Sequence, residues 1–293
     1  MDNKVYILLP VHNRKDITKK FISSLLKQNY QNYHLILIDD GSTDGTADIV
    51  SQNIPPEKLT ILSGKGNWWW GGSLHQGYKW IKKNKINPED LVLMMNDDTI
   101  FEPDFLTKGI ELITKSTKTL LLAYSYSQQT KKILDRGVHV DWKSHTFRQA
   151  TNDNEINCLQ TMGLIFYVKD FYKIGGFHPI LIPHYVSDYD FTIKANQKGY
   201  KLTTNEEFKL FTDEKTTNND TSKIVKHKTI FDYFKSTYSV RSPVNPVSWF
   251  FFTLFRAPGI WKITGILKVL KIILLDIKHY LIGDIKYLFS KKK

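Results

Sequence analysis

The chain has 293 residues, of which 41% are hydrophobic and 13% aromatic, so it can bury a substantial core and is not expected to be disordered. The only cysteine is Cys158, which excludes an internal disulfide and favours a reducing compartment. The net charge of +12 is uneven, because residues 223–293 carry 14 Lys/Arg against 3 Asp, a balance of +11, which leaves +1 for residues 1–222. We therefore expect a nearly neutral body over 1–222 and a basic tail over 223–293 that favours an anionic partner.

Strands and helices alternate over the first hundred residues. Apolar runs predict buried strands at 5–10, 33–39, 58–63 and 91–97, and apolar residues at helical spacing predict helices at 16–28, 46–52 and 73–84. This alternation is typical of an α/β fold with a mostly parallel central sheet and flanking helices. Later segments predict a strand at 119–127, a strand or part of a hairpin at 133–142, helices at 170–177 and 187–202, and a polar loop at 212–223.

Polar residues follow three of the predicted strands. Pro10, Val11, His12 and Asn13 come after the first strand, the sequence DDGS at 39–42 follows the second, and Asn96, Asp97 and Asp98 follow the fourth. The carboxyl ends of parallel strands meet at one edge of a sheet, where open α/β folds bind ligands. We therefore expect these three clusters to lie near one another.

Adjacent carboxylates at the end of a buried strand imply a nearby cation. Asp97 and Asp98 repel each other when both are ionised, and burial adds to the cost. The alternative is a purely structural role, in which one of them caps the helix predicted after Pro103, although Asp104 is better placed as a cap.

Four stretches resemble family-2 inverting glycosyltransferases of the GT-A fold. They are VYILLPVHNRKDITKKFISSLLKQNYQNYHLILIDDGSTDGT, GNWWWGGSLHQGY, LMMNDDTIFEPDFL and HYVSDYDFTIKANQKGY, in the order that the family has them, over about residues 3–205. The branch that they resemble contains bacterial rhamnosyl- and galactofuranosyl-transferases. The resemblance implies transfer of a sugar from a nucleoside-diphosphate donor, with UDP or dTDP as the nucleotide, to a glycan or lipid-linked glycan of a bacterial surface polysaccharide.

The resemblance also assigns donor-binding residues. It places Asp40 at the donor base, with Pro10, His12 and Asn13 beside it in the nucleotide pocket. The alternative for Asp40 is turn chemistry with Gly41. Asn96 and Asp97 stand at the start of the family's metal motif, and Asp98 is the expected ligand of Mg²⁺ or Mn²⁺, since such cations bind carboxylate and diphosphate oxygens together.

Asp188 is the expected general base. The family has a Glu-Asp pair at the start of a late helix, and this sequence has Ser187 and Asp188 there, so the Glu is missing. A carboxylate at that place can take the proton of an acceptor hydroxyl as it attacks the anomeric carbon. The alternatives are that Asp188 only caps the helix, or that Asp190 is the base.

The segment at 66–77 carries the remaining candidates. Trp70 and Gly71 are expected to line the donor or acceptor pocket, and core packing is an equally good interpretation of the tryptophans. His75 is a candidate for contact with the donor phosphate, or else a surface residue of a helix. His184 and His227 are candidates for a late histidine near the diphosphate. The scattered histidines predict no soft-metal site.

The tail at 249–293 combines apolar and basic residues. Lys268, Lys271, Lys278, His279 and Lys286 fall on one side of a helix drawn through it, and isoleucines and leucines fall opposite. This pattern predicts a helix lying in an anionic membrane surface, which would place the protein on the inner face of the cell membrane. The alternative is packing on the body or in a homo-oligomer. No signal peptide and no spanning helix are expected.

Three other classes of protein compete with a transferase. A nucleic-acid-binding protein needs cations spread over a binding face, whereas here they lie in one apolar region, so no nucleic-acid partner is expected. A dinucleotide-dependent oxidoreductase needs a Gly-rich turn after the first strand, which is absent. A degenerate transferase fold acting as a glycan-binding module remains an alternative, because residue 187 is not Glu.

Overall fold

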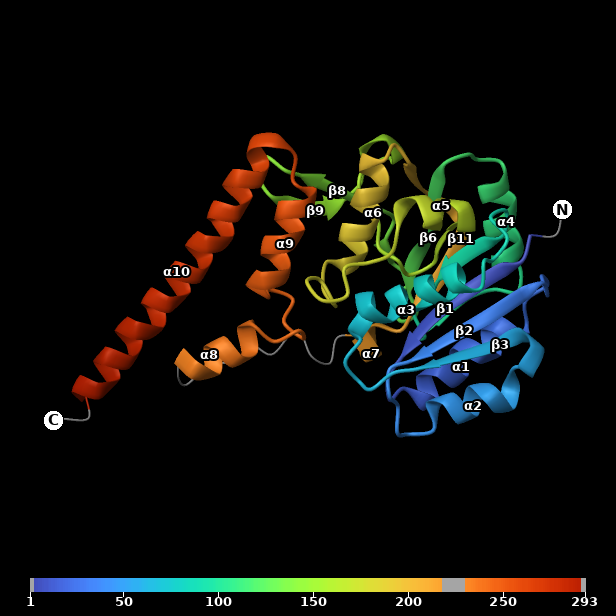
Figure 1. Ribbon diagram of the computed structural model, residues 1–293, viewed down its shortest axis with the longest axis horizontal. Helices are drawn as coiled ribbons and strands as arrows, with labels where there is room; N and C mark the ends of the chain where they lie inside the picture. The colour runs from blue at the N-terminus through green and yellow to red at the C-terminus, as the bar shows by residue number, and fades with distance from the viewer. Residues whose placement is uncertain (1–2, 218–229, 291–293) are drawn as a thin grey trace.

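The computed structural model describes residues 3–217 and 230–290 (Figure 1). In that part of the chain one sheet holds nine strands, in the order β3-β2-β1-β4-β10-β6-β11-β5, with β7 paired to β6. The strands are β1 (Val5–Val11), β2 (Tyr33–Asp39), β3 (Leu59–Ser63), β4 (Leu91–Met94), β5 (Thr99–Ile100), β6 (Thr119–Ser127), β7 (Ile133–Asp135), β10 (Leu164–Tyr167) and β11 (Lys201–Thr212).

The sheet is mostly parallel. Strands β1 to β4 run in one direction, β10 is antiparallel to both of its neighbours, and β6 and β11 are parallel to each other. A separate hairpin is formed by β8 (Val138–Asp141) and β9 (Thr146–Gln149). The stretch at 133–142, predicted as a strand or part of a hairpin, is thus divided between the sheet and this hairpin, with Gly137 at positive φ between the two.

Helices cover both faces of the sheet. Alternate residues of β1 face opposite ways, since Val5, Ile7 and Leu9 pack with α1, α2 and α4, whereas Tyr6 and Leu8 pack with α3, α5 and α6. The helices are α1 (Lys15–Leu26), α2 (Thr46–Asn53), α3 (Trp69–Lys83), α4 (Phe105–Thr114), α5 (Val168–Ile174), α6 (Ser187–Gln197), α7 (Glu214–Thr217), α8 (Ile230–Thr237), α9 (Pro246–Arg256) and α10 (Gly259–Ser290), with short 3₁₀ turns at Pro56–Lys58 and Asp153–Glu155.

The C-terminal part is not one continuous helix. Pro258 follows Arg256 at the end of α9, and its ring and missing N–H separate α9 from α10. Helix α9 packs on the body, where Phe252 is buried in a third apolar cluster with residues of β8 and α6. Helix α10 contacts α9 and α8 and projects away from the sheet (Figure 1). The division at 222/223 into two domains stays a prediction, and α9 shares a core with the body.

Helix α10 exposes large apolar side chains to solvent. The first four follow one another at spacings of three and four residues, and three more lie close after them. The side chains that are more than 40% exposed are Ile260, Ile263, Leu267, Leu270, Ile272, Leu274 and Leu275. In the described ranges no helix has a long enough apolar stretch with few enough charges to cross a bilayer.

Candidate active site

The ends of β1 and β2 are joined by polar contacts. Pro10 is buried in β1 opposite Ile38 of β2. His12 Nδ1 lies 2.7 Å from the carbonyl oxygen of Asp40, and the backbone N–H of Asn13 donates to Ser42 Oγ at 2.9 Å. These contacts bring three predicted nucleotide-pocket residues to one edge of the sheet, with His12 and Asn13 exposed.

Asp40 anchors the segment that follows β3. Its two carboxylate oxygens accept four backbone N–H groups, from residues 66–69, at distances of 2.8 to 3.1 Å. The segment lies so close that a Cβ on Gly64 would stand 2.5 Å from Asp40 Oδ1, and one on Gly41 would stand 2.8 Å from the backbone nitrogen of Gly66. A donor base that binds Asp40 would therefore share its carboxylate with the backbone of residues 66–69. The contact between Asp40 and the donor base stays a prediction.

The start of α3 connects three parts of the site. The Trp70 ring N–H donates to Thr161 Oγ1 at 3.0 Å, in the loop before β10. The backbone N–H of Gly71 donates to the Pro183 carbonyl at 2.8 Å. A Cβ on Gly71 would lie 2.6 Å from the Cβ of Ser187, so only glycine allows α3 to approach the start of α6 this closely. Through α3 the structure links Asp40 with the helix that carries Asp188.

Strained backbone flanks both of these helix starts. Trp69 and Val186 each have φ of +57°, a conformation that bulky and β-branched residues rarely adopt. The Trp69 ring lies 5.6 Å from the ring of His184, and the Arg241 guanidinium lies 5.5 Å from the same Trp69 ring. Burial, assisted by the charge of Arg241, lowers the pKa of His184 to about 4, so His184 is neutral at neutral pH. Strain of this kind gathers at functional sites.

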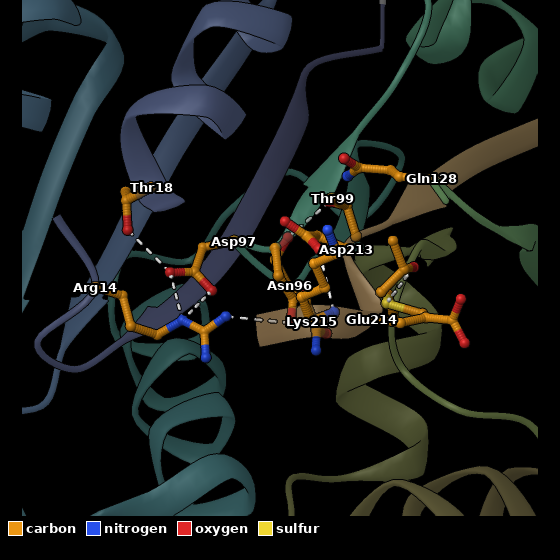
Figure 2. A network of polar contacts seen from close by, with 12 residues as sticks. Arg14, Thr18, Asn96, Asp97, Thr99, Gln128, Asp213, Glu214 and Lys215 are labelled. Atoms are coloured by element: carbon orange, nitrogen blue, oxygen red, sulfur yellow. Dashed lines mark hydrogen bonds and ion pairs between the residues drawn. The ribbon is translucent and has the colours of Figure 1, made fainter. Parts of the chain in front are cut away.

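Arg14 is the cation beside the paired carboxylates (Figure 2). Its Nε lies 2.9 and 3.0 Å from the two oxygens of Asp97, and its Nη2 lies 3.1 Å from Asp98 Oδ2. Thr18 Oγ1 donates to Asp97 at 2.9 Å. Burial raises the pKa of Asp97 to about 6 although Arg14 opposes the shift. The sequence implied a cation here, and an arginine on the loop before α1 supplies one.

The oxygen donors at this point suit a hard divalent cation. Asp97 and Asp98 are about 5% exposed, and the side-chain oxygen of Asn96 is buried without a hydrogen-bond partner among the described residues. Carboxylate and amide oxygens are what Mg²⁺ and Mn²⁺ prefer. No group of three His, Cys, Asp or Glu side chains in 3–217 and 230–290 is arranged to hold a metal ion. A cation bound here would therefore take ligands from a bound phosphate as well.

Asp188 has the properties of a base near neutral pH. It lies in the first turn of α6, is partly buried, and accepts the backbone N–H of Tyr189 at 3.0 Å. Burial raises its pKa to about 6, and the charge of Asp135 adds to the shift. Asp135, in β7, is itself buried, and burial raises its pKa to about 6. Sequence reasoning missed Asp135, which brings a second carboxyl group near Asp188 where residue 187 provides none.

Asp190, the alternative base, is engaged in a buried ion pair. Arg256 Nε of α9 lies 2.6 Å from one of its oxygens, and His178 Nδ1 lies 2.8 Å from the other. Burial alone would raise the pKa of Asp190, but the His178 hydrogen bond and the Arg256 charge hold it below its usual range. We infer that Asp190 fastens α9 to α6, and this contact leaves Asp188 as the better base.

His75 lies on another side of α3. A Cβ on Gly176 would stand 2.5 Å from His75 Nδ1, and the His75 ring lies 5.8 Å from that of Tyr78. Burial lowers the pKa of His75. Gly176 belongs to the loop after α5 and Tyr78 to α3 itself, and neither is one of the residues at the strand ends. Contact between His75 and the donor phosphate therefore stays a prediction. His227 lies outside the described residues.

Comparison with other proteins agrees with this geometry. The mostly parallel sheet with helices on both faces is that of the GT-A fold. The chain matches the family described as "Glycosyl transferase family 2" over residues 6–174, more than half its length, and it belongs to that family. The predicted fold class and family are thus confirmed, whereas the rhamnosyl- and galactofuranosyl-transferase branch stays a prediction.

Known relatives match only part of the chain. TuaG of Bacillus subtilis (strain 168), a glycosyltransferase whose name refers to teichuronic acid biosynthesis, is 26% identical over 160 residues, which is 54% of this chain and 61% of TuaG. An uncharacterized glycosyltransferase of Haemophilus influenzae is 24% identical over 195 residues, 66% of this chain and 62% of the relative. The aligned part therefore spans less than two thirds of either relative.

Solved structures show the same fold. S. aureus TarS 1–349 in complex with UDP-GlcNAc superposes with a TM-score of 0.60 at 15% identity, covering 92% of this chain and 71% of that one. The mannosyltransferase PcManGT of Pyrobaculum calidifontis, in complex with GDP-Man and Mn²⁺, superposes with a TM-score of 0.52 at 13% identity, covering 71% of this chain and 56% of that one.

Proposed function

We propose that this protein is an inverting glycosyltransferase that moves a sugar, a hexose by preference, from a UDP- or dTDP-linked donor to a glycan or lipid-linked glycan of the bacterial surface. The observation that supports this most strongly is the convergence on α3. That helix is anchored to Asp40 at the end of β2 and packs through Gly71 on the helix that carries Asp188. The name of one relative, TuaG, refers to teichuronic acid biosynthesis, which supports a surface polysaccharide as the product.

The donor would lie along the strand ends. Pro10, His12, Asn13 and Asp40 would surround the nucleoside, with Trp70 and Gly71 at the start of α3 beside the sugar. The diphosphate would lie near Asn96, Asp97 and Asp98. Arg14 already pairs with both carboxylates, so we expect its guanidinium to turn from them toward the diphosphate when the donor binds.

The chemistry of transfer is assigned to Asp188. With a pKa of about 6 its carboxylate is ionised at neutral pH, yet basic enough to accept the proton of an acceptor hydroxyl. The hydroxyl oxygen then attacks the anomeric carbon opposite the leaving diphosphate, which inverts that carbon. Asp98, with Asp97 and Asn96 beside it, would hold Mg²⁺ or Mn²⁺, which supplies charge neutralisation for the leaving diphosphate.

The C-terminal helix would hold the protein at the membrane. Helix α10 exposes leucines and isoleucines together with Lys268, Lys271 and Lys278. Insertion of the apolar side chains into an anionic surface, with the lysines at the head groups, explains this combination better than nucleic-acid binding, which gains nothing from exposed leucines. We place the protein on the cytoplasmic face of the membrane, where an acceptor carried on lipid would be within reach.

Two measurements test the transferase proposal. The purified chain is incubated with each of a set of UDP- and dTDP-sugars and Mn²⁺, and thermal stabilisation and release of nucleoside diphosphate are recorded. We expect one donor to stabilise the protein and to be turned over, and EDTA to abolish turnover. Undiminished turnover in EDTA would contradict the metal assignment, and no stabilisation by any donor would contradict the transferase itself. Without an acceptor the sugar is transferred to water, so proton NMR of the released sugar, recorded before it mutarotates, reports whether the anomeric configuration is inverted.

A further inference from the structure

An apolar pocket lies between the β8–β9 hairpin, α9 and the first half of α10. Its volume is about 280 Å³. It is separate from the strand-end site, since none of the donor-site residues lines it. The lining residues are Trp142, His145, Phe147, Val244, Pro246, Trp249, Phe252, Thr253, Gly265, Lys268, Val269 and Ile272.

Four aromatic rings form most of its wall. Phe147 lies 5.6 Å from Trp249 and 6.0 Å from Phe252, and Trp142 lies 5.8 Å from Phe252. The ring N–H of Trp249 already donates to the Pro243 carbonyl at 2.8 Å. The surface offered to a ligand is therefore mostly carbon, which suits a hydrocarbon ligand.

A single lysine stands at the rim. Lys268 lines the pocket yet is exposed to solvent, and its Nζ donates to the Ser144 carbonyl at 3.1 Å, which holds it over the β8–β9 turn. Among the residues that line the pocket there is no carboxylate. His145 is the other titratable lining residue, and burial together with the charge of Lys268 lowers its pKa. An apolar interior with a cation at its mouth suits a hydrocarbon chain with an anionic head group.

The pocket opens onto the apolar surface of α10. Ile272 lines the pocket and is 51% exposed, and Leu267 and Leu270 on the same helix are 59% and 44% exposed. A chain that leaves a bilayer beside α10 therefore meets exposed apolar side chains next to the pocket. This continuity distinguishes the pocket from an isolated core defect.

The pocket also adjoins the proposed base. The Phe147 ring, which lines the pocket, stacks on the Tyr189 ring with centroids 5.5 Å apart and an interplanar angle of 12°. Tyr189 follows Asp188 in α6, and its backbone N–H donates to the Asp188 carboxylate. Tyr189 thus contacts a ring of the pocket wall with its side chain and the Asp188 carboxylate with its backbone.

We propose that this pocket binds the hydrocarbon chain of an anionic amphiphile, with Lys268 facing the acidic head group. Resting on the proposed function, we identify that amphiphile as the lipid-linked acceptor. Taking a methylene group as similar in volume to a water molecule, about 30 Å³, the pocket holds roughly nine of them. The rest of a longer chain would lie along α10.

Titration calorimetry with n-alkyl phosphates tests the chain-binding inference on the full-length protein. The probes carry 4, 6, 8, 10 and 12 carbons, below their micelle concentrations, with inorganic phosphate as the headgroup control. We expect each added methylene to tighten binding about fourfold up to roughly nine carbons and little beyond. Affinity that does not depend on chain length, or inorganic phosphate that binds as tightly, would overturn the inference.

Two pairs of variants locate the site. V269W fills the pocket, whereas L270W adds the same ring to the outside of α10, so we expect at least a tenfold loss of decyl phosphate affinity for V269W alone. K268E reverses the charge at the rim, and K271E reverses an exposed lysine that does not line the pocket. K268E should weaken decyl phosphate at least fivefold and leave decanol binding unchanged, and K271E should change neither.

If decyl phosphate binds V269W as tightly as L270W and binds K268E as tightly as K271E, the chain does not bind in this pocket. If V269W fails to fold, the comparison of K268E with K271E still tests the location. The calorimetry needs no sugar transfer, so it separates the two proposals. Chain-dependent binding without any donor turnover would refute only the transferase proposal, whereas turnover without chain-dependent binding would refute only the pocket assignment.

Discussion

Replacing Asp188 by Asn should make the protein more stable and inactive at the same time. The D188N change keeps the shape of the side chain and the acceptor for the Tyr189 N–H, which now lies 3.0 Å away, and removes only the charge. A residue kept for catalysis rather than for folding should behave in this way, because its buried charge costs stability.

The size of the effect follows from the shifted pKa. Burial raises the pKa of Asp188 from 3.8 to about 6, a difference of about two units, which corresponds to at most about 3 kcal/mol. The folded state holds this proton more tightly than the unfolded state. The contribution of Asp188 to stability is therefore fully present below about pH 4 and is lost as the pH rises through about 6. D188N has no such loss.

Thermal unfolding of the two proteins between pH 4.5 and 8 measures this difference. About 1 kcal/mol of this effect is already lost at pH 4.5, so about 2 kcal/mol remains to be lost by pH 8. Relative to wild type, the melting temperature of D188N should rise across that range by roughly 4 °C, at about 2 °C per kcal/mol for a chain of this size. D104N is the matched control, because Asp104 is an exposed carboxylate paired with Lys108. The difference in melting temperature between D104N and wild type should stay the same from pH 4.5 to 8. If the difference in melting temperature between D188N and wild type stays constant with pH, the assignment of a partly buried carboxylate with a raised pKa is refuted.

Three further changes have defined outcomes. R14Q leaves Asp97 and Asp98 facing each other, so its melting temperature should fall by several degrees and Mn²⁺ should restore it, as differential scanning fluorimetry with and without Mn²⁺ can show. G71A places a Cβ 2.6 Å from that of Ser187 and should lower kcat at least tenfold. Adding S187G should recover part of this loss, and no recovery would mean that the contact between residues 71 and 187 does not position α6. Ending the chain at Pro258 removes α10 but keeps α9, so sedimentation with anionic vesicles should fall while donor binding persists.

The structure moves the point at which the tail can be removed from residue 249, where the sequence predicts its start, to Pro258. A tail defined by charge alone begins before α9, and deletion from residue 249 would remove the Phe252 ring from the core and leave Asp190 without Arg256. Charge composition separates acidic from basic segments, but it does not report which apolar residues complete a core. Pro258 marks the physical boundary instead.

Sequence reasoning succeeded where the signal was local. The run that forms β1 is apolar, and the run that forms β2 is apolar apart from His34 and the final Asp39. Polar residues follow both runs, so the strands and the clusters after them could be placed. Helix α3 begins at Trp69, four residues before the predicted start, because two tryptophans and two glycines carry no helix signal and the preceding contacts with Asp40 fix the first turn.

Residues that act through distant partners could not be predicted. Arg14 meets Asp97 and Asp98 from more than 80 positions away, and only the pairing of β1 with β4 brings them together. Asp135 lay in a stretch predicted as a strand or hairpin, and nothing in its neighbourhood pointed to Asp188. The anchoring of residues 66–69 by Asp40 likewise depends on backbone N–H groups, which leave no trace in a sequence.

The central claim is that a divalent cation and a nucleotide diphosphate meet at Asp98. A crystal grown with Mn²⁺ and UDP or dTDP, measured for the anomalous signal of manganese, tests it most directly. We predict a manganese peak about 2.1 Å from an Asp98 carboxylate oxygen and from diphosphate oxygens, with Arg14 turned away from Asp98. A nucleotide bound at Asp40 with no manganese at Asp98, or manganese bound far from the strand ends, would contradict the account.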